Sequence, residues 1–280
     1  MILVGLTGWG DHDSLYRHVS SRNKLAEYAA HFPTVEVDSM FYAIQSPQII
    51  EKWIDMTPSS FKFVVKAYQG ITGHLRGENP YPTKEAMFTA FETSILAFGE
   101  KLGMILCQFP PWFTCEKQNV DYIRFLTERY KNYPMAIEFR HQSWYKPEFR
   151  EKTITFLTKN NLIHGVCDEP QAGEGSIPFV PIPTKADTVL IRLHGRNLYG
   201  WNASGQPNWR EVRYLYDYSI EELKSIERDV QLLSQSTKNV YILFNNNSGG
   251  HAAANAKSFM ELANITYTGL ADKQLDLFSE

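Results

Sequence analysis

Short apolar runs alternate along this chain with longer segments of helical periodicity, and this alternation limits the fold more than any other feature. Eight runs that end in a polar residue or directly before one are strand candidates: Ile2–Thr7, Thr34–Asp38, Phe61–Lys66, Met104–Gln108, Met135–Phe139, Leu162–Asp168, Thr188–His194 and Val240–Phe244. Such alternation is typical of a parallel sheet covered by helices. Eight strands are the number that a closed barrel requires. We therefore predict an α/β fold, a TIM-type (β/α)8 barrel.

The segments between these runs have the spacing of amphipathic helices. Outer helices are predicted over residues 25–32, from Ser46-Pro47 to Ile54, and over Thr83–Leu102, Val120–Tyr130, Glu148–Lys159, Ile220–Leu233 and His251–Leu262. Gly103 is expected to end the third of them as a C′ glycine. The segment Glu169–Asp187 contains four prolines and two glycines, so a loop is predicted to replace the helix between the sixth and seventh strands.

Length and composition agree with one folded domain. A chain of 280 residues is typical of a single α/β barrel. With 43% hydrophobic and 21% charged residues, it belongs to the folded globular proteins. A net charge of −3 argues against a nonspecific nucleic-acid coat but leaves room for a local basic pocket. We predict one barrel domain over residues 1–270 and a flexible tail over residues 271–280.

The cysteines and the N-terminus bear on the compartment. Cys107, Cys115 and Cys167 have neither a CxxC spacing nor an even count, so free thiols are predicted. No basic segment followed by a long apolar run opens the chain, and no stretch reaches the roughly 20 apolar residues of a membrane helix. We expect a cytoplasmic protein with no membrane contact.

Polar residues end almost every predicted strand, where an α/β barrel keeps its active site. They are Glu36, Asp38, Lys66, Gln108, Glu138, Arg140, Asp168, Arg192, His194, Arg196 and Asn245. Residues i and i+2 of a strand share a face, so several of these side chains point together. Because buried charges are costly unless they are paired, the set predicts a salt-bridged network or a ligand pocket. The usual site of barrel chemistry favours the pocket.

The residue types suggest roles within such a pocket. Substrate binding is assigned to the groups suited to phosphate or carboxylate oxygens and their amide neighbours: Lys66, Gln108, Arg140, Arg192, Arg196 and Asn245. An anionic substrate is therefore expected. Catalysis is assigned to the candidate acids and bases Glu36, Glu138, Asp168 and His194. For the carboxylates, holding the arginines in place is an equally good role.

A metal site is an open alternative, whereas a nucleotide cofactor is not expected. Carboxylate and imidazole groups suit magnesium, manganese or zinc, and the candidate ligands are Glu36, Glu138, Asp168 and His194. The chain contains no HExxH, HxH, GKS/T, GxGxxG or GxSxG pattern. The metalloprotease, P-loop, dinucleotide and serine-hydrolase classes therefore lose their best support.

Two aromatic loops follow the third and seventh predicted strands. Ala67–Pro82 carries His74 and Arg76, and Gly195–Tyr218 carries Trp201 and Trp209 among several tyrosines. These loops could cover the barrel mouth and stack on flat ligand rings. Packing against the rim of the barrel is the commoner fate of such aromatic side chains.

Several motifs along the chain resemble one known family. They are Thr7-Gly8-Trp9, Val35-Glu36-Val37-Asp38-Ser39-Met40-Phe41-Tyr42, Gln108-Phe109-Pro110-Pro111, Glu138-Phe139-Arg140-His141-Gln142-Ser143-Trp144, Arg192-Leu193-His194-Gly195-Arg196, Phe244-Asn245-Asn246-Asn247 and Asn255-Ala256. Together they resemble the YecE-like family of domains of unknown function, over nearly the whole chain. The resemblance implies a TIM-type barrel and leaves the reaction open. The chain departs from the family at Thr72-Gly73-His74, where the family usually reads Thr-His.

The C-terminal residues Gln274-Leu275-Asp276-Leu277-Phe278 resemble the pentapeptide with which bacterial polymerases and repair proteins bind the replicative sliding clamp. Such a peptide places its glutamine, here Gln274, in a small polar pocket and its last pair, here Leu277 and Phe278, in an apolar cleft. A tail that packs on the barrel is the alternative. Clamp binding would imply a substrate that is DNA or lies near it.

Three functional hypotheses follow from these residues. The first is an enzyme, a hydrolase or lyase, that acts on a phosphorylated or other anionic substrate, including a nucleic-acid phosphodiester near the clamp. The second is metal-independent acid–base chemistry on a small sugar or carboxylate, with Glu36 or Glu138 and His194. The third is a non-catalytic module that binds an anion or links a partner to the clamp.

Overall fold

A computed structural model of the chain describes residues 1–16, 19–202 and 209–272 and confirms the eight-stranded barrel. The strands are β1 (Ile2–Thr7), β2 (Thr34–Val37), β3 (Lys62–Lys66), β4 (Leu102–Gln108), β5 (Met135–Glu138), β6 (Ile163–Asp168), β7 (Thr188–Leu193) and β8 (Asn239–Phe244). Neighbouring strands pair in parallel, and β1 pairs with β8, so the barrel closes in chain order. The predicted division into residues 1–270 and a tail stays a prediction.

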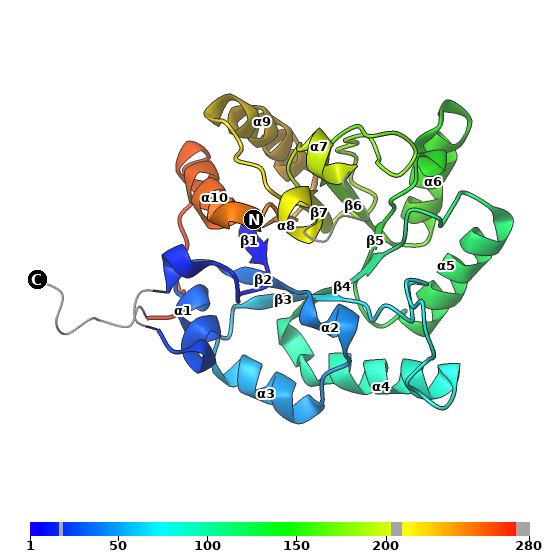
Figure 1. Ribbon diagram of the computed structural model, residues 1–280, viewed down its shortest axis with the longest axis horizontal. Helices are drawn as coiled ribbons and strands as arrows, with labels where there is room; N and C mark the ends of the chain where they lie inside the picture. The colour runs from blue at the N-terminus through cyan, green and yellow to red at the C-terminus, as the bar shows by residue number, and fades with distance from the viewer. Residues whose placement is uncertain (17–18, 203–208, 273–280) are drawn as a thin grey trace, which may run out of the picture.

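Helices surround the barrel (Figure 1). The outer ones are α1 (Lys24–Ala29), α3 (Pro47–Asp55), α4 (Lys84–Ala97), α5 (Lys117–Arg129), α6 (Pro147–Lys159), α9 (Ile220–Ser236) and α10 (His251–Leu262). The short α2 (Ser39–Tyr42), α7 (Leu198–Trp201) and α8 (Trp209–Arg213) lie nearer the middle of the view. Short 3-10 turns are η1 (Asp13–Leu15), η2 (Ser21–Asn23), η3 (Gly99–Lys101), η4 (Gln142–Tyr145) and η5 (Ser248–Gly250). Residues 169–187, all described, form the predicted loop without a regular helix.

The predicted end of α4 at Gly103 is wrong. The helix ends at Ala97, and Gly103 lies inside β4. The glycine with a positive φ, of 51°, is Gly99, where the chain turns from the helix toward the strand. The helical spacing of the apolar residues Ile95 and Phe98 continues to Leu102, the first residue of β4, and this concealed the boundary in the sequence. The amphipathic spacing of α3 predicts an apolar face that includes Ile49 and Ile50; Ile50 is buried, but Ile49 is 37% exposed.

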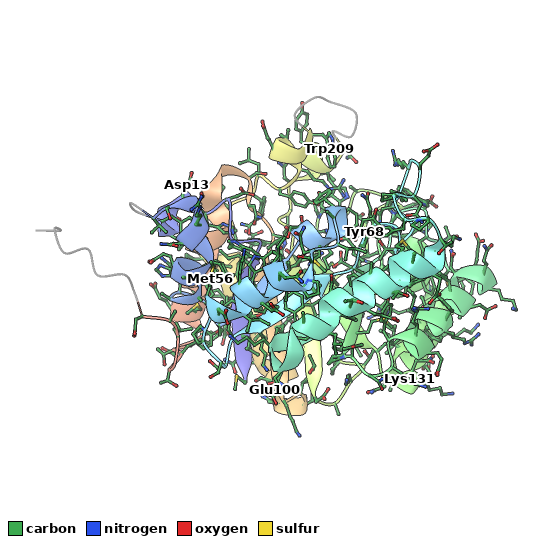
Figure 2. All side chains as sticks on the ribbon, turned by 90° about the horizontal axis from the view of Figure 1, so that it is seen from below. Asp13, Met56, Tyr68, Glu100, Lys131 and Trp209 are labelled. Atoms are coloured by element: carbon green, nitrogen blue, oxygen red, sulfur yellow. The ribbon has the colours of Figure 1, made fainter. Side chains whose placement is uncertain are left out.

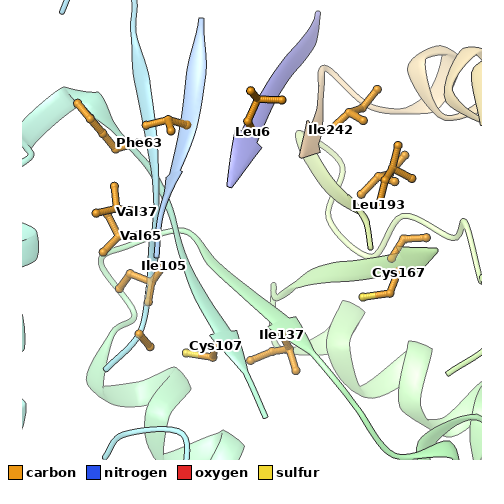
Figure 3. Close-up of a cluster of buried hydrophobic side chains, with 14 of the residues drawn as sticks. Leu6, Val37, Phe63, Val65, Ile105, Cys107, Ile137, Cys167, Leu193 and Ile242 are labelled. Carbon is orange, nitrogen blue, oxygen red and sulfur yellow. The ribbon is translucent and has the colours of Figure 1, made fainter. Parts of the chain in front are cut away.

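Alternate residues of the strands belong to two separate apolar cores. One core lies between the barrel and its helices and includes Val65, Ile105 and Ile137 (Figure 3). The other fills the barrel interior and consists of Leu3, Val64, Met104, Leu106, Ala136, Ile163, Leu190, Tyr241 and Leu243. Because residues i and i+2 share a face, the interior rows of most strands continue into a polar residue at the strand end. In β6, Asp168 lies on the opposite face from the interior residue Ile163. The other polar strand ends converge inside the barrel mouth.

The two faces of the barrel are separated by the full length of its strands. Figure 2 shows Trp209, which follows β7, at one end of the molecule, and Glu100 and Lys131, which precede β4 and β5, at the other. The end near Trp209 is therefore the C-terminal face. The three cysteines are free thiols, as predicted. Within the described residues, none of the helices combines the length and apolarity needed to cross a bilayer.

Candidate functional site

Arg192 lies at the centre of the polar strand ends and pairs with two carboxylates. Its Nε and Nη2 donate to the two carboxylate oxygens of Glu36 at 2.8 and 2.6 Å. Its Nη1 donates to Glu138 Oε2 at 2.7 Å and to Gln108 Oε1 at 3.1 Å. The three charged side chains are at most 1% exposed. Bidentate, charge-assisted pairs of this kind are the strong form of hydrogen bonding in proteins, so β2, β4, β5 and β7 are joined through one guanidinium.

Arg140 extends this network to the other side of Glu138. Its Nε donates to Glu138 Oε1 and its Nη1 to Glu169 Oε2, both at 2.6 Å. Glu169 Oε1 accepts the N–H of Ile177 at 2.7 Å. Burial alone would raise the pKa of Glu138, but Arg192 and Arg140 hold that pKa well below its usual value. We call Glu36, Glu138, Arg140, Glu169 and Arg192 the charged layer.

His194 is enclosed by this layer and is neutral. Its side chain has no exposed area, and its two ring nitrogens lie 3.0 Å from Arg140 Nη2 and 2.7 Å from Asn245 Nδ2. An imidazolium carries N–H on both nitrogens and would set two donors against these amino groups, whereas the neutral ring sets only one. Burial, followed by the charge of Arg140, lowers the pKa of His194 well below its usual value. The ring is therefore held where it can neither gain a proton easily nor reach solvent.

Lys66 and Asp38 form a second ion pair at the ends of β3 and β2. Lys66 Nζ donates to Asp38 Oδ1 at 2.7 Å and lies 4.6 Å from the centre of the Phe41 ring. Burial alone would lower the pKa of Lys66, but Asp38 and Glu36 raise it. Lys66 is therefore charged, with Asp38 as its counter-ion.

Asp168 and Arg196 form a third ion pair, apart from the charged layer. Arg196 Nη2 donates to Asp168 Oδ1 at 2.9 Å, and the Tyr218 hydroxyl donates to Asp168 Oδ2 at 2.6 Å. Arg196 also donates to Glu222 at 3.1 Å. These contacts fasten the loop after β7 to the start of α9. Asp168 is thus not gathered with the other expected metal ligands, Glu36, Glu138 and His194.

A pocket of about 1130 Å³ opens at the C-terminal face beside the charged layer. All eight strand ends or the segments that follow them contribute to its lining. We call it the mouth pocket. Four residues predicted to bind substrate line it: Lys66, Gln108, Arg140 and Asn245. The predicted catalytic residues Glu36, Glu138 and His194 and the predicted substrate-binding residue Arg192 lie below the lining in the barrel interior, with at most 1% exposure.

Arg213, at the end of α8, lines the mouth pocket and was not singled out by sequence reasoning. Its guanidinium lies 3.8 Å from the centre of the Trp201 ring, and Arg140 lies 5.5 Å from the same ring. The Nε of Arg213 is buried without a hydrogen-bond partner in the described residues. Burial lowers the pKa of Arg213, and the charge of Arg140 adds to this effect. Two cations thus converge on one buried tryptophan. The only signal in the sequence is an arginine between aromatic residues.

His74 lines the mouth pocket from the loop after β3. Its ring packs against Phe41 and Trp112, with ring centres 5.0 and 5.9 Å away, and its Nδ1 lies 2.9 Å from the Thr72 hydroxyl. Burial, followed by the charges of Lys66 and Arg140, lowers the pKa of His74 to about 4. This ring is therefore an uncharged imidazole at neutral pH that lies beside the cations of the pocket.

Glu138, Cys167 and His194 have ligand atoms within 4.8 Å of one another, the spacing of a metal site. Both oxygens of Glu138 already accept hydrogen bonds from Arg140 and Arg192, so a divalent cation would face two guanidiniums. Burial raises the pKa of the Cys167 thiol well above its usual value, whereas a metal requires the thiolate. The chemistry of this donor set does not fit a divalent metal.

Glu169 gives a testable pH dependence, because burial raises its pKa to about 7 although Arg140 opposes the shift. Between pH 4.5 and 7 the folded protein holds this proton and the unfolded chain does not, so this contribution to stability falls as pH rises. We expect the free energy of unfolding of the wild type, minus that of Glu169→Gln, to decrease from pH 5 to pH 8 in urea titrations. Glu151→Gln, on the exposed side of α6, is the control. A difference that increases with pH would contradict a raised pKa.

The predicted clamp-binding residues Gln274, Leu277 and Phe278 lie outside the described residues, and their role stays a prediction.

Comparison with known proteins agrees with the fold. A family model described as "Protein of unknown function DUF72" matches residues 3–276. The UPF0759 protein YunF of Bacillus subtilis is 52% identical over 99% of this chain and 100% of its own length. The UPF0759 protein YecE of Escherichia coli is 24% identical over 55% of this chain and 54% of its own length.

A solved structure extends the agreement to three dimensions. The crystal structure of a DUF72 family protein from Enterococcus faecalis is 39% identical, covers 99% of this chain and 100% of its own, and superposes with a TM-score of 0.92. The predicted resemblance to the YecE-like family is therefore confirmed. The chain belongs to the DUF72 family of barrel proteins.

Proposed function

We propose that the mouth pocket binds an anionic ligand, with a phosphate or carboxylate group beside Arg213 and Arg140. The observation that carries the proposal is Arg213, a partly exposed cation of the pocket lining whose buried Nε has no hydrogen-bond partner among the described residues. The guanidiniums of the charged layer already have carboxylate partners, so Arg213 is the cation best placed to bind a ligand. Planar guanidinium groups suit the oxygens of phosphate and carboxylate.

Replacement of Arg213 tests this proposal directly. Charge-assisted hydrogen bonds contribute about 1.5–3 kcal/mol, so we expect Arg213→Gln to weaken the binding of inorganic phosphate at least about tenfold, measured by isothermal titration calorimetry. The matched control is Arg228→Gln, on the exposed side of α9, which should bind phosphate like the wild type. Equal phosphate affinity in the wild type and Arg213→Gln would remove the basis of the proposal.

For an enzyme, we propose His74 rather than His194 as the group that accepts a proton. His74 lines the pocket and is uncharged at neutral pH, with Nδ1 beside the Thr72 hydroxyl. His194 is enclosed by Arg140 and Asn245. In hydrolysis of a phosphodiester, water would attack phosphorus and pass a proton to His74, while the P–O bond to one ester oxygen breaks and the leaving alkoxide takes up a proton from solvent. The DNA form of this hypothesis depends on the clamp-binding tail.

The same residue separates an enzyme from a binding module. The enzyme hypothesis predicts hydrolysis of bis(4-nitrophenyl) phosphate by the wild type, lost in His74→Gln, while phosphate binding persists in both proteins. The binding-module hypothesis is favoured by one observation: Glu36 and Glu138 have their carboxylates engaged by arginines and closed to solvent. It predicts no hydrolysis by either protein and unchanged phosphate affinity.

A further inference from the structure

Arg140 and the hydrogen-bond acceptors of the mouth pocket come from opposite sides of the barrel, and Arg213, from α8, joins Arg140 at the Trp201 ring. In a closed barrel with its strands in chain order, β1 lies opposite β5. Arg140 follows β5, whereas Thr7 ends β1 and Asn247 follows its neighbour β8. Asp11 lines the pocket on the same side as Thr7. We call Thr7, Asp11 and Asn247 the acceptor wall.

The acceptor wall contains an oxygen that lacks a partner. Asn247 Nδ2 donates to the carbonyl oxygen of Thr7 at 3.0 Å, while Asn247 Oδ1 is buried and accepts no hydrogen bond from the described residues. The Thr7 hydroxyl donates weakly to Glu36 at 3.4 Å, which leaves its lone pairs as acceptors. A buried polar atom without a partner costs about 1–3 kcal/mol. A ligand that donates hydrogen bonds here would remove that cost.

The charges on this wall favour neutral donors over an ammonium group. Its buried acceptors, Thr7 and Asn247, are uncharged. The carboxylate of Asp38 nearby is neutralised by Lys66 at 2.7 Å, and Asp11 is exposed to solvent. A buried ammonium needs a carboxylate partner, and none of the wall's buried side chains offers one. Hydroxyl groups are the neutral donors that match such acceptors.

The size of the pocket agrees with a ligand that reaches both sides. Pockets for small molecules usually measure about 300–1,000 Å³, and the mouth pocket has about 1130 Å³. An inorganic phosphate ion would occupy only a small part of it. An organic phosphate has the length to place its anionic group near Arg140 and Arg213 and its other groups against the acceptor wall.

From these observations we infer that the ligand is a polyhydroxylated organic phosphate, with its phosphate near Arg140 and Arg213 and its hydroxyls donating to Asn247 and Thr7. This inference rests on the proposed anion site and names the class of its ligand.

Calorimetric titration with three probes tests the inference: inorganic phosphate, ribose 5-phosphate and phosphoethanolamine. Because the hydroxyls add one or two hydrogen bonds, we expect ribose 5-phosphate to bind on the order of tenfold more tightly than phosphate. Phosphoethanolamine, which carries an ammonium group, should bind no more tightly than phosphate.

Two variants assign the difference to the acceptor wall. Asn247→Leu and the near-isosteric Thr7→Val should each weaken ribose 5-phosphate binding about three- to tenfold and leave phosphate binding unchanged. Thr89→Val, exposed on α4, is the control for the threonine substitution and should bind both probes normally. Thr7→Val keeps the shape of the side chain, so it tests the wall even if Asn247→Leu folds poorly.

The outcomes separate this inference from the proposed function. Equal affinities for phosphate and ribose 5-phosphate would overturn the hydroxyl subsite and leave the anion site standing. Tighter binding of phosphoethanolamine than of ribose 5-phosphate would also overturn it, in favour of an ammonium subsite. Failure of both phosphate and ribose 5-phosphate to bind would overturn the proposed function, and the inference with it.

Discussion

Arg192→Met should lower the free energy of unfolding by about 3–5 kcal/mol, the cost of breaking a buried ion pair on one side. The substitution fills much of the same space but removes the donors at 2.6 and 2.8 Å from Glu36. Glu36 would keep only the weak contact with the Thr7 hydroxyl at 3.4 Å, whereas Glu138 would still have Arg140. Urea unfolding followed by circular dichroism measures the loss.

The pH dependence and two further variants identify the cause of this loss. Burial already raises the pKa of Glu36 in the wild type, although Arg192 opposes the shift. Loss of Arg192 should raise this pKa further, so the deficit of Arg192→Met should grow from pH 5 to pH 8. Glu36→Gln combined with Arg192→Met should recover part of the stability. Arg124→Met breaks the exposed pair with Asp121 and should cost at most about 1 kcal/mol. Similar losses for Arg192→Met and Arg124→Met would mean that the charged layer contributes little to stability.

Trp144→Ala should cost about 3–5 kcal/mol, as expected for truncation of a large buried aromatic side chain. Trp144 is 1% exposed and stacks on Phe139 and Phe113, with ring centres 4.0 and 5.8 Å away. Its Nε1 donates to the carbonyl oxygen of Phe113 at 2.7 Å. Truncation would leave a cavity and an unpaired carbonyl behind the strand ends that carry Gln108 and Arg140. Chemical unfolding measures the loss of stability in Trp144→Ala, and phosphate titration measures any loss of phosphate affinity.

Trp112→Ala is the matched control for this substitution. Trp112 is 50% exposed and lines the mouth pocket, so its removal should change the free energy of unfolding by no more than about 0.5 kcal/mol. A loss of several kcal/mol in Trp112→Ala, or none in Trp144→Ala, would contradict the division between aromatic residues of the core and those of the pocket rim.

The barrel could be predicted because each strand is indicated by a short local pattern of apolar residues. The strand that ends at Gln108, for example, reads as an apolar run with a polar end, and β4 does end there. The loop of residues 169–187 could be predicted because prolines exclude a helix. The end of α4 could not, because one apolar pattern passes through Leu102 from the helix into β4.

The site was predicted less completely, since side-chain partners are a property of the folded chain. Their positions at strand ends predict that Glu138 and Arg192 lie together, and they do. The same positions could not show that this pair is closed to solvent, whereas Lys66 lines the pocket. Some of the polar strand ends form a salt-bridged network and others line a pocket. Asp168 also ends a strand, yet it pairs with Arg196 outside the charged layer. Arg213 falls in the segment predicted as a loop, where no strand periodicity indicates which side chains face the pocket.

The pairing of Glu36 with Arg192 joins residues that are 156 positions apart. This separation limits how much of the barrel can fold while the chain is still being synthesised. At about 5–20 residues per second, Arg192 leaves the ribosome roughly 8–30 s after Glu36. Until then the glutamate has no guanidinium to accompany it into the barrel interior, and hydration is its favourable state. The N-terminal part of the nascent chain can therefore form helices and local contacts, but the mouth of the barrel can assemble only after β7 has been synthesised.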